Sequence, residues 1–194
     1  MKTHETYLNG QFINLRPLDS DDAQLTLSWR LLRRARYLNA GAQSIEAQEK
    51  WISSRPNSEY NFIVELKDKT SVGMISLIDI NIVNRRAEPA RFLIGNEKAV
   101  EGIPAAAEAE KLLFEFAFNK LKLLRIYGTV AANNTKMITW NKFIGIKEEG
   151  RLRNHLFLDG KFIDAVFLGL LEPEYREITV PRLESLLRIV KTKT

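Results

Sequence analysis

The stretch "FLIGNEKAVEGIPAAAEAEK", residues 92–111, leads from an apolar strand through a short loop into a helix. Pro104 lies in the first helical turn, where its missing amide N–H costs nothing. The amides of Ala105, Ala106 and Ala107 follow at the positive end of the helix dipole, and their small side chains let a ligand approach the backbone. The stretch predicts either a pyrophosphate-binding turn or an alanine-rich helix start packed against a core.

The helix that begins here is the clearest in the chain and covers about residues 101–123. Its spacing predicts a buried stripe, made of Ala109, Leu112, Leu113, Phe116 and Leu121. Glu108, Glu110 and Lys111 are expected to face water.

Alternating apolar residues bounded by turn residues predict strands on both sides of this helix. They cover residues 11–18, 61–66, 71–80, 87–95, 124–130, 153–160 and 161–171, the last two joined at Asp159-Gly160. Further helices are expected over 19–36, 44–54 and 133–146. Pro89 cannot donate to a sheet ladder, so its strand needs a bulge or an open edge. The order predicts a mixed α/β domain with seven strands and about four helices.

The segment "NNTKMITWNKFIGI", residues 133–146, has the signals of a short amphipathic helix. Asn133 or Asn134 is suited to cap its start, and Gly145 to end it in a left-handed conformation. One asparagine is then left for another task.

Composition argues against several kinds of site. The chain has 194 residues, a formal charge of +5, no cysteine, and two histidines, His4 and His155. Neither thiolate chemistry nor a histidine-rich metal centre is expected, and no metal is predicted. The basic residues do not form one face with interleaved aromatics, so no nucleic-acid partner is expected. There is no apolar run long enough for a membrane span and no apolar leader, which predicts a cytoplasmic protein.

The order of these segments resembles the GNAT superfamily of acyl-CoA N-acetyltransferases, over about residues 11–174. The resemblance rests on the succession "FIVELKDKTSVGMISLIDI", "NRRAEPARFLIG", "EGIPAAAEAEKLLFEFAF", "LRIYGTV" and "NNTKMITWNKFIGIKEEGRLRNH". It is similar to the branch of ribosomal-protein N-terminal acetyltransferases and nucleotide-linked amino-sugar acetyltransferases, and "NRRAE" and "RYLNAGAQSIEAQEKWISS" are similar to the amino-sugar group. The resemblance implies one acetyltransferase domain over 1–174 and a partly helical C-terminal extension over 175–194.

The resemblance also implies a GNAT fold whose mostly antiparallel sheet splays between its fourth and fifth strands to bind acetyl-CoA. Pantetheine would lie along Phe92, Leu93, Ile94 and Gly95, with amides near Leu93 and Ile94 polarising the thioester carbonyl. The pyrophosphate would lie on Gly102, Ile103, Pro104, Ala105, Ala106 and Ala107. Ala99 and Pro104 depart from the phosphate loop of the family.

Two asparagines would complete the cofactor site. Asn134 would hydrogen-bond the pantetheine arm. Asn141 stands at the position of the tyrosine with which many relatives protonate the leaving thiolate, and an amide cannot act as that acid. Water, or no acid at all, is left for that step.

The resemblance implies that Glu88 is the base that removes the ammonium proton, unless it is paired with Arg86 or Arg91. His155 is the second catalytic candidate, with a hydrogen bond inside a strand as its alternative role. Arg30, Asn39 and Asp164 are assigned to the acceptor, and Asp164 could equally be a cross-strand partner.

The predicted function is transfer of acetyl from acetyl-CoA to a primary amine of a nucleotide-linked amino sugar, for surface-polysaccharide synthesis. Acetylation of a protein N-terminus or another small amine is the alternative, as is a module that binds CoA without turnover. A homodimer is one possible assembly.

Overall fold

The computed structural model describes residues 7–38, 41–56 and 58–191 of the chain. Its strands are β1 (Leu8–Asn9), β2 (Ile13–Pro17), β3 (Tyr60–Leu66), β4 (Ser71–Asn81), β5 (Arg86–Ile94), β6 (Arg125–Ala131), β7 (Lys147–Leu158) and β8 (Lys161–Leu171). Its α-helices are α1 (Ala23–Arg30), α2 (Ile45–Ser53), α3 (Ala105–Glu115), α4 (Thr135–Phe143), α5 (Glu172–Glu174) and α6 (Val180–Lys191). The segments η2 (Ser20–Asp22), η3 (Arg33–Tyr37) and η4 (Lys98–Val100) are 3₁₀-helical, and η5 (Phe116–Lys120) and η6 (Tyr175–Thr179) are π-helical turns.

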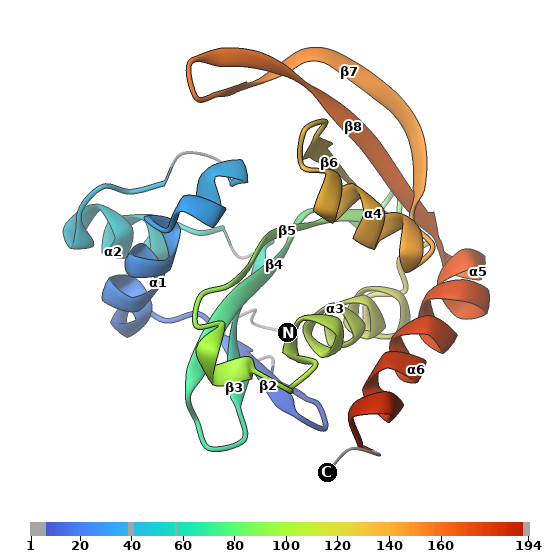
Figure 1. Cartoon of the computed structure of the whole chain (residues 1–194), viewed down its shortest axis with the longest axis horizontal. Helices are drawn as coiled ribbons and strands as arrows, with labels where there is room; N and C mark the ends of the chain where they lie inside the picture. The colour runs from blue at the N-terminus through green and yellow to red at the C-terminus, as the bar shows by residue number, and fades with distance from the viewer. Residues whose placement is uncertain (1–6, 39–40, 57, 192–194) are drawn as a thin grey trace.

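The strands form one sheet in the order β1-β2-β3-β4-β5-β6-β8-β7. Neighbours are antiparallel except β5 and β6, which are parallel and pair only at Arg86–Arg125 and Ala87–Ile126. Beyond these two pairs the strands diverge, so the predicted splay is confirmed (Figure 1). The sheet of the described residues has eight strands instead of the predicted seven, because the two-residue β1 pairs with β2.

β5 is irregular where the sequence places Pro89. The β4–β5 register shifts after the pair Ser76–Ala90, so two residues of β5, Arg91 and Phe92, oppose one residue of β4. Arg91 has a φ of 55°, in the left-handed region that a bulge can impose. Pro89 itself lies beyond the last β5–β6 pair, on the open edge. Both expected features, a bulge and an open edge, are present.

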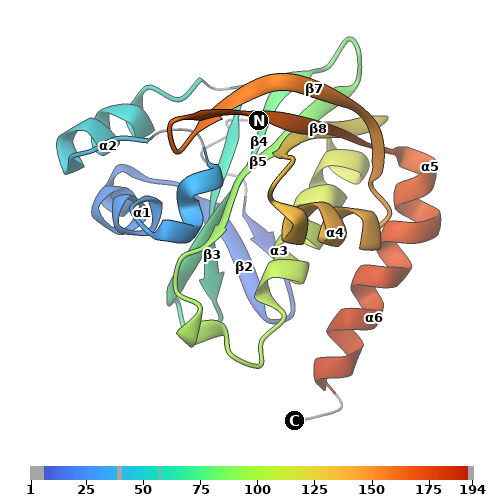
Figure 2. The same ribbon diagram turned by 45° about the horizontal axis from the view of Figure 1, so that its top comes forward.

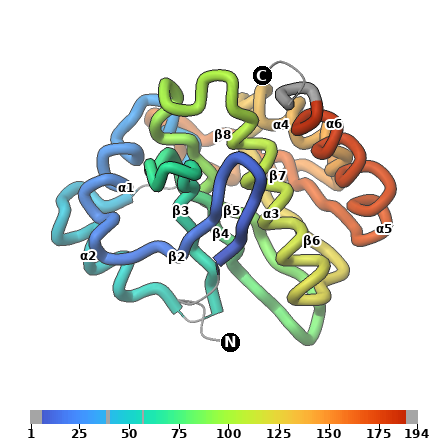
Figure 3. Tube along the Cα trace, turned by 90° about the horizontal axis from the view of Figure 1, so that it is seen from below, coloured from blue at the N-terminus to red at the C-terminus, as the bar shows by residue number. Residues whose placement is uncertain are grey.

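Helices cover both faces of the sheet, so two apolar clusters are needed to bury it. Alternate side chains of β3 divide between them, with Phe62 and Val64 on the α3 face and Ile63 on the α1–α2 face. Figure 2 shows α1 and α2 on one side of the strands and α3, α4 and α6 on the other. The tube in Figure 3 shows the same division from below, with α1 and α2 on one flank and α5 and α6 on the other.

The prediction that Glu108 and Glu110 face water is wrong. Glu108 is 3% exposed and accepts the amides of Gln11, Phe12 and Ile13 at 2.5–2.8 Å, so it orders the turn before β2. Glu110 is 6% exposed and accepts the indole N–H of Trp140 at 2.6 Å. Buried carboxylates are tolerated only with such partners, and both sets of partners are distant in the sequence.

Several element boundaries differ from the expected ones. α1 ends at Arg30, before the expected residue 36, and leaves Leu31 61% exposed. α3 covers only residues 105–115 and continues in the π-helical turn η5. β7 begins at Lys147, earlier than the expected residue 153, because β8 supplies partners between Lys147 and Leu152.

The segment after residue 174, expected as an extension, packs on α3. Tyr175 stacks on Phe118 with 4.5 Å between ring centroids. Leu183 and Leu187 of α6 belong to the same apolar cluster as α3.

Candidate active site

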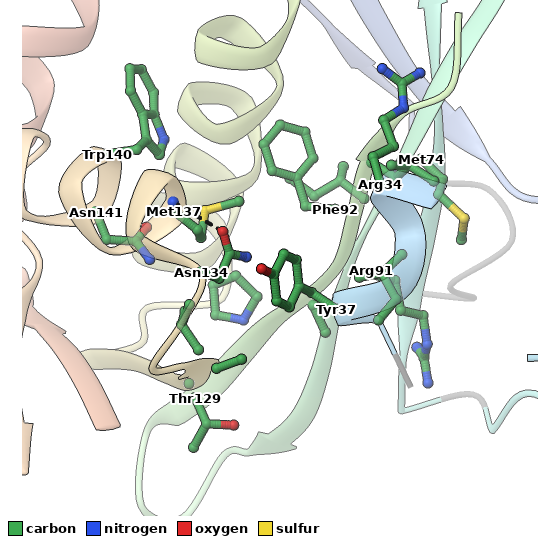
Figure 4. Close-up of a pocket in the computed structure, with 18 of the residues that line it drawn as sticks. Arg34, Tyr37, Met74, Arg91, Phe92, Thr129, Asn134, Met137, Trp140 and Asn141 are labelled. Atoms are coloured by element: carbon green, nitrogen blue, oxygen red, sulfur yellow. Dashed lines mark hydrogen bonds between the residues drawn. The ribbon is translucent and has the colours of Figure 1, made fainter. Parts of the chain in front are cut away.

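A cleft of about 1360 Å³ opens where β5 and β6 separate. Its walls are β5, β6, the inner faces of α3 and α4, and η3 with the following residues. Figure 4 shows side chains from these elements around the cleft, with Tyr37 and Asn134 pointing toward one another. The described chain thus has a wedge large enough for a cofactor as well as a small substrate.

The open edge of β5 offers backbone amides to this cleft. The amide of Gly95 donates to the carbonyl of Val72 in the neighbouring chain segment at 2.7 Å. Because amides alternate in direction along a strand, that of Leu93 points to β4 and that of Ile94 to the open edge. Of the two amides expected to polarise a thioester, only that of Ile94 is available to the cleft.

The predicted pyrophosphate turn is formed in part. Gly102 has a φ of 75° with nothing near its missing Cβ, a conformation that suits glycine. The amide of Ala105 donates to the carbonyl of Ile103 at 2.8 Å, so the expectation of three free alanine amides is wrong. Those of Ala106 and Ala107 remain at the open first turn, and Ala106 lines the cleft. The turn therefore fits an anionic group with fewer donors than expected.

Not every residue assigned to the cofactor faces the cleft. The residues Gly102, Ile103, Pro104, Ala105 and Ala107 are not among the lining residues, and Ala105 is 1% and Ala107 6% exposed. Gly95 is also outside the lining, and a Cβ there would lie 2.1 Å from the Trp29 ring. Packing of α1 against the end of β5 explains this glycine.

Asn134 is the residue that caps α4, because its Oδ1 accepts the amide of Met137 at 3.4 Å. The side-chain Nδ2 lies at the cleft, so one amide group can serve both the cap and a ligand. Asn141 also lines the cleft and is 8% exposed. Figure 4 shows Tyr37 facing Asn134 from the opposite wall, where its hydroxyl donates to the carbonyl of Asn133 at 3.4 Å.

Glu88 lines the cleft near the point where the two strands separate. A Cβ on Gly128 of β6 would lie 3.6 Å from the Glu88 carboxylate, so the side chain faces the opposite strand. Within the described residues Glu88 has no ion pair, since Arg86 is bound to Asp79 and Arg91 to Glu59. Burial, with the charge of Asp79, raises the pKa of Glu88 against the opposing effect of Arg91.

The family model of the acetyltransferase (GNAT) domain matches residues 13–146, the part of the chain that forms this wedge. The chain belongs to the GNAT family. It is 32% identical to spermidine N(1)-acetyltransferase of Escherichia coli K12 over 118 residues, which cover 61% of either protein. It is 34% identical to YdaF of Bacillus subtilis, a candidate ribosomal N-acetyltransferase, over 57% of this chain and 58% of that protein. The aligned part thus spans less than two thirds of the length of these relatives.

Solved GNAT structures align over more of the chain. Spermidine N-acetyltransferase from Vibrio cholerae, solved with CoA and spermine, has a TM-score of 0.77 at 26% identity and covers 87% of this chain and 100% of that one. A GCN5-related N-acetyltransferase from Brucella melitensis has a TM-score of 0.79 at 20% identity, over 96% of this chain and 87% of that one, and shows likeness of fold alone. The expected superfamily and fold are confirmed, and the comparisons do not single out the amino-sugar branch.

Glu110 is a cleft residue of this GNAT chain that sequence reasoning missed. Ala106, Glu110 and Phe114 follow one another at intervals of four along α3 and all line the cleft. Burial raises the pKa of Glu110 to about 7, although the hydrogen bond from Trp140 acts in the opposite direction. The only signal in the sequence was that Glu110 lies four residues after Ala106, and therefore on the same face of the helix as a residue predicted to bind the cofactor.

One side of the cleft is rich in arginine. Arg30, Arg33, Arg34, Arg36 and Arg91 line it. Arg34 forms an ion pair with Glu97, and Arg91 binds Glu59 at 2.9 Å. Burial and the charge of Arg91 lower the pKa of Arg30. These arginines outnumber the carboxylates that face them, so this side attracts anions.

Two of the remaining predicted site residues, His155 and Asp164, lie apart from the cleft lining. His155 is exposed on β7 and is not among the lining residues. Asp164 accepts the amide of Asn154 at 3.0 Å and lies 3.7 Å from Arg151, so it bridges β8 to β7. Asn39 lies outside the described residues.

Among the described residues, histidine, cysteine and carboxylate side chains form no group of three that could hold a metal ion. No helix in this part of the chain is long and apolar enough to cross a membrane.

Proposed function

We propose that this GNAT protein is an acetyl-CoA-dependent N-acetyltransferase that acts on the primary amine of a small molecule. The observation that carries the proposal is the wedge between β5 and β6 with a buried carboxylate, Glu88, near its vertex. Acetyl-CoA supplies the acetyl group as an activated thioester. The fit of this cofactor rests on the open first turn of α3 and on the unpaired edge of β5.

Each wall of the wedge has a role in direct transfer. The amide of Ala106 would bind the pyrophosphate, and Nδ2 of Asn134 would bind the pantetheine arm. The amide of Ile94 stabilises the oxyanion that develops during attack. Glu88 takes the proton of the substrate ammonium, directly or through water, and its raised pKa makes it a better acceptor of that proton.

For the acceptor we propose an amine that also carries an anionic group, of which a nucleotide-linked amino sugar is the leading example. Arg33 and Arg36 of η3 support it, because they line the cleft and guanidinium groups can bind phosphates by paired N–H donors. The similarity to the amino-sugar group in "NRRAE" points the same way.

A polyamine is the second candidate acceptor. Relatives named as spermidine acetyltransferases support it. A polycation would meet net repulsion from the arginines on the η3 side, so we rank it below an anionic amine. Protein N-termini are a third possibility, supported by the likeness to YdaF.

The test measures turnover of a panel of acceptors at one acetyl-CoA concentration. The release of the CoA thiol reports the rate for each acceptor. We expect the highest kcat/KM for a nucleotide-linked amino sugar. Preference for spermidine or for an N-terminal peptide would overturn the acceptor assignment. Acetyl-CoA binding by calorimetry without transfer to any amine would overturn the activity and favour a CoA-binding module.

A variant pair tests the arginines themselves. Arg33→Gln with Arg36→Gln is expected to lower kcat/KM for the anionic amine about tenfold, the loss of roughly one charged hydrogen bond. The Kd of acetyl-CoA should not change. Arg188→Gln, on the exposed surface of α6, removes the same kind of charge as a control. Loss of acetyl-CoA affinity in the double variant would instead assign these arginines to the cofactor phosphates.

A further inference from the structure

Many relatives use a tyrosine to protonate the departing thiolate, and Asn141 at that position cannot do so. The carboxyl group of Glu110, like that of Glu88, lines the same cleft. Glu110 of α3 and Trp140 and Asn141 of α4 all line the cleft. Figure 4 shows the Trp140 and Asn141 side chains on different sides of α4, with the Trp140 ring beside α3. The carboxyl group of Glu110 is thus held at α4 by Trp140, the residue that precedes Asn141 in the sequence.

The carboxyl group of Glu110 is held in place by a hydrogen bond, and among the described residues no cation forms an ion pair with it. Oε2 accepts the indole N–H of Trp140 at 2.6 Å, and within the described residues Oε1 has no recorded partner. Its neighbours on α3 are engaged elsewhere, Glu108 with the turn before β2 and Lys111 with Glu115. Because a lone buried carboxylate is costly, this environment favours the protonated form.

Charged groups on the other walls do not pair with it. Lys136 of α4 and Glu88 of β5 line the same cleft, and neither forms a hydrogen bond or ion pair with Glu110 among the described residues. The arginines of η3 lie on the opposite side of the cleft from α3, and Arg34 there binds Glu97. Glu110 is therefore free to exchange a proton with a group bound in the cleft.

We infer that Glu110 is the general acid of the transfer and gives its proton to the sulfur of the departing CoA. The inference rests on the proposed function. As the amine nitrogen bonds to the acetyl carbon, the C–S bond breaks and its electron pair stays on sulfur. The O–H bond of Glu110 then breaks to form the thiol. The substrate ammonium loses two protons on its way to the amide: Glu88 passes the first to water before the attack and takes the second as the amide forms. Exchange with water returns both carboxyl groups to their starting forms.

The inference predicts a basic limb in the pH profile. The acid must be protonated, so kcat should fall as pH rises through the pKa of Glu110, about 7. Glu110→Gln should lower kcat by about 10²-fold and remove this limb, with the Kd of acetyl-CoA unchanged. Asn141→Tyr in the Glu110→Gln background should restore part of kcat.

Trp140→Phe separates a proton donor from a merely structural residue. The indole N–H stabilises the carboxylate, so its loss should raise the pKa of Glu110 and move the basic limb to higher pH. A structural role for Glu110 predicts loss of stability without movement of the limb.

Two measurements do not depend on turnover. Wild-type protein should show an infrared band of a protonated carboxyl that titrates near pH 7 and is absent in Glu110→Gln. Folded Glu110 holds its proton between the unfolded pKa, near 4.5, and about 7, so stability should fall as pH rises across this window. Glu110→Gln should lack this fall in Tm.

The outcomes separate this inference from the proposed function. A wild-type protein that acetylates none of the amines contradicts the proposed function. A wild-type protein that transfers acetyl while kcat stays flat from pH 6 to pH 9, or a Glu110→Gln variant with the wild-type profile, overturns the inference alone. If Glu110→Gln does not fold, the pH profile of kcat in the wild type and its shift in Trp140→Phe still test whether Glu110 is the acid.

Discussion

Glu88 and Glu110 are both carboxylates of the wedge, but their surroundings suit them to opposite tasks. Glu88 faces β6 near the vertex, with the charge of Arg91 limiting the rise in its pKa. Glu110 lies deeper, with a hydrogen bond from Trp140 but no cation. Two carboxyl groups whose environments separate their pKa values are suited to act as base and acid.

Glu88→Gln tests the base. We expect kcat/KM to fall by about 10²- to 10⁴-fold, because an amide cannot accept the ammonium proton. In the wild type, activity should rise with pH through the pKa of Glu88, and this limb should vanish in the variant. Glu49→Gln, exposed on α2, is the control. An unchanged acid limb in Glu88→Gln would remove Glu88 from the mechanism.

The family resemblance points to Glu88, which lines the cleft, whereas the helical pattern of α3 misplaces Glu108 and Glu110. Periodicity identifies the apolar stripe of α3 and gives every charged residue to the solvent face. Glu108 is buried by the amides of residues 11–13, and Glu110 by Trp140. Such partners come from other elements, so no spacing within α3 could reveal them.

Glu108→Ala is predicted to destabilise the fold by about 3 kcal/mol, because three backbone donors of the turn before β2 lose their acceptor. The free energy of unfolding in urea measures this. Glu177→Ala, exposed in η6, should change it little. Equal values for the two variants would mean that water replaces the carboxylate at no cost.

At the scale of elements, the sequence predicts the order of strands and helices, but it does not predict all of their boundaries. The β2–β5 strands carry apolar alternation, and Pro89 signals the open edge of β5. The first half of β7, "KEEGRL", is exposed and has no such pattern. This segment is a strand because it pairs with β8, and its own residues carry no signal of that pairing.

Gly95→Ala tests the packing of α1 on the end of β5. The added methyl would lie 2.1 Å from the Trp29 ring, so the two elements must move apart. We expect a loss of about 3 kcal/mol in the free energy of unfolding. Gly150→Ala is the matched control, because nothing lies within 4 Å of its added Cβ. A tolerated Gly95→Ala would show that Trp29 can repack.

At the scale of the whole molecule, residues after 174 complete the core on the α3 face. Leu183 is fully buried in the cluster that also holds Phe118 and Tyr175. Leu183→Ala should therefore lower the free energy of unfolding by about 3 kcal/mol. Ser185→Ala, on the exposed side of α6, should not. A Leu183→Ala variant as stable as the wild type would mean that 1–174 folds independently of α6.

The central claim is that the wedge between β5 and β6 binds acetyl-CoA. A crystal structure of the protein with acetyl-CoA tests it most directly. We predict pantetheine along the open edge of β5, the thioester carbonyl at the amide of Ile94, and the pyrophosphate at the first turn of α3, beside Ala106. Cofactor bound elsewhere, or a wedge that stays empty at saturating acetyl-CoA, would contradict the account.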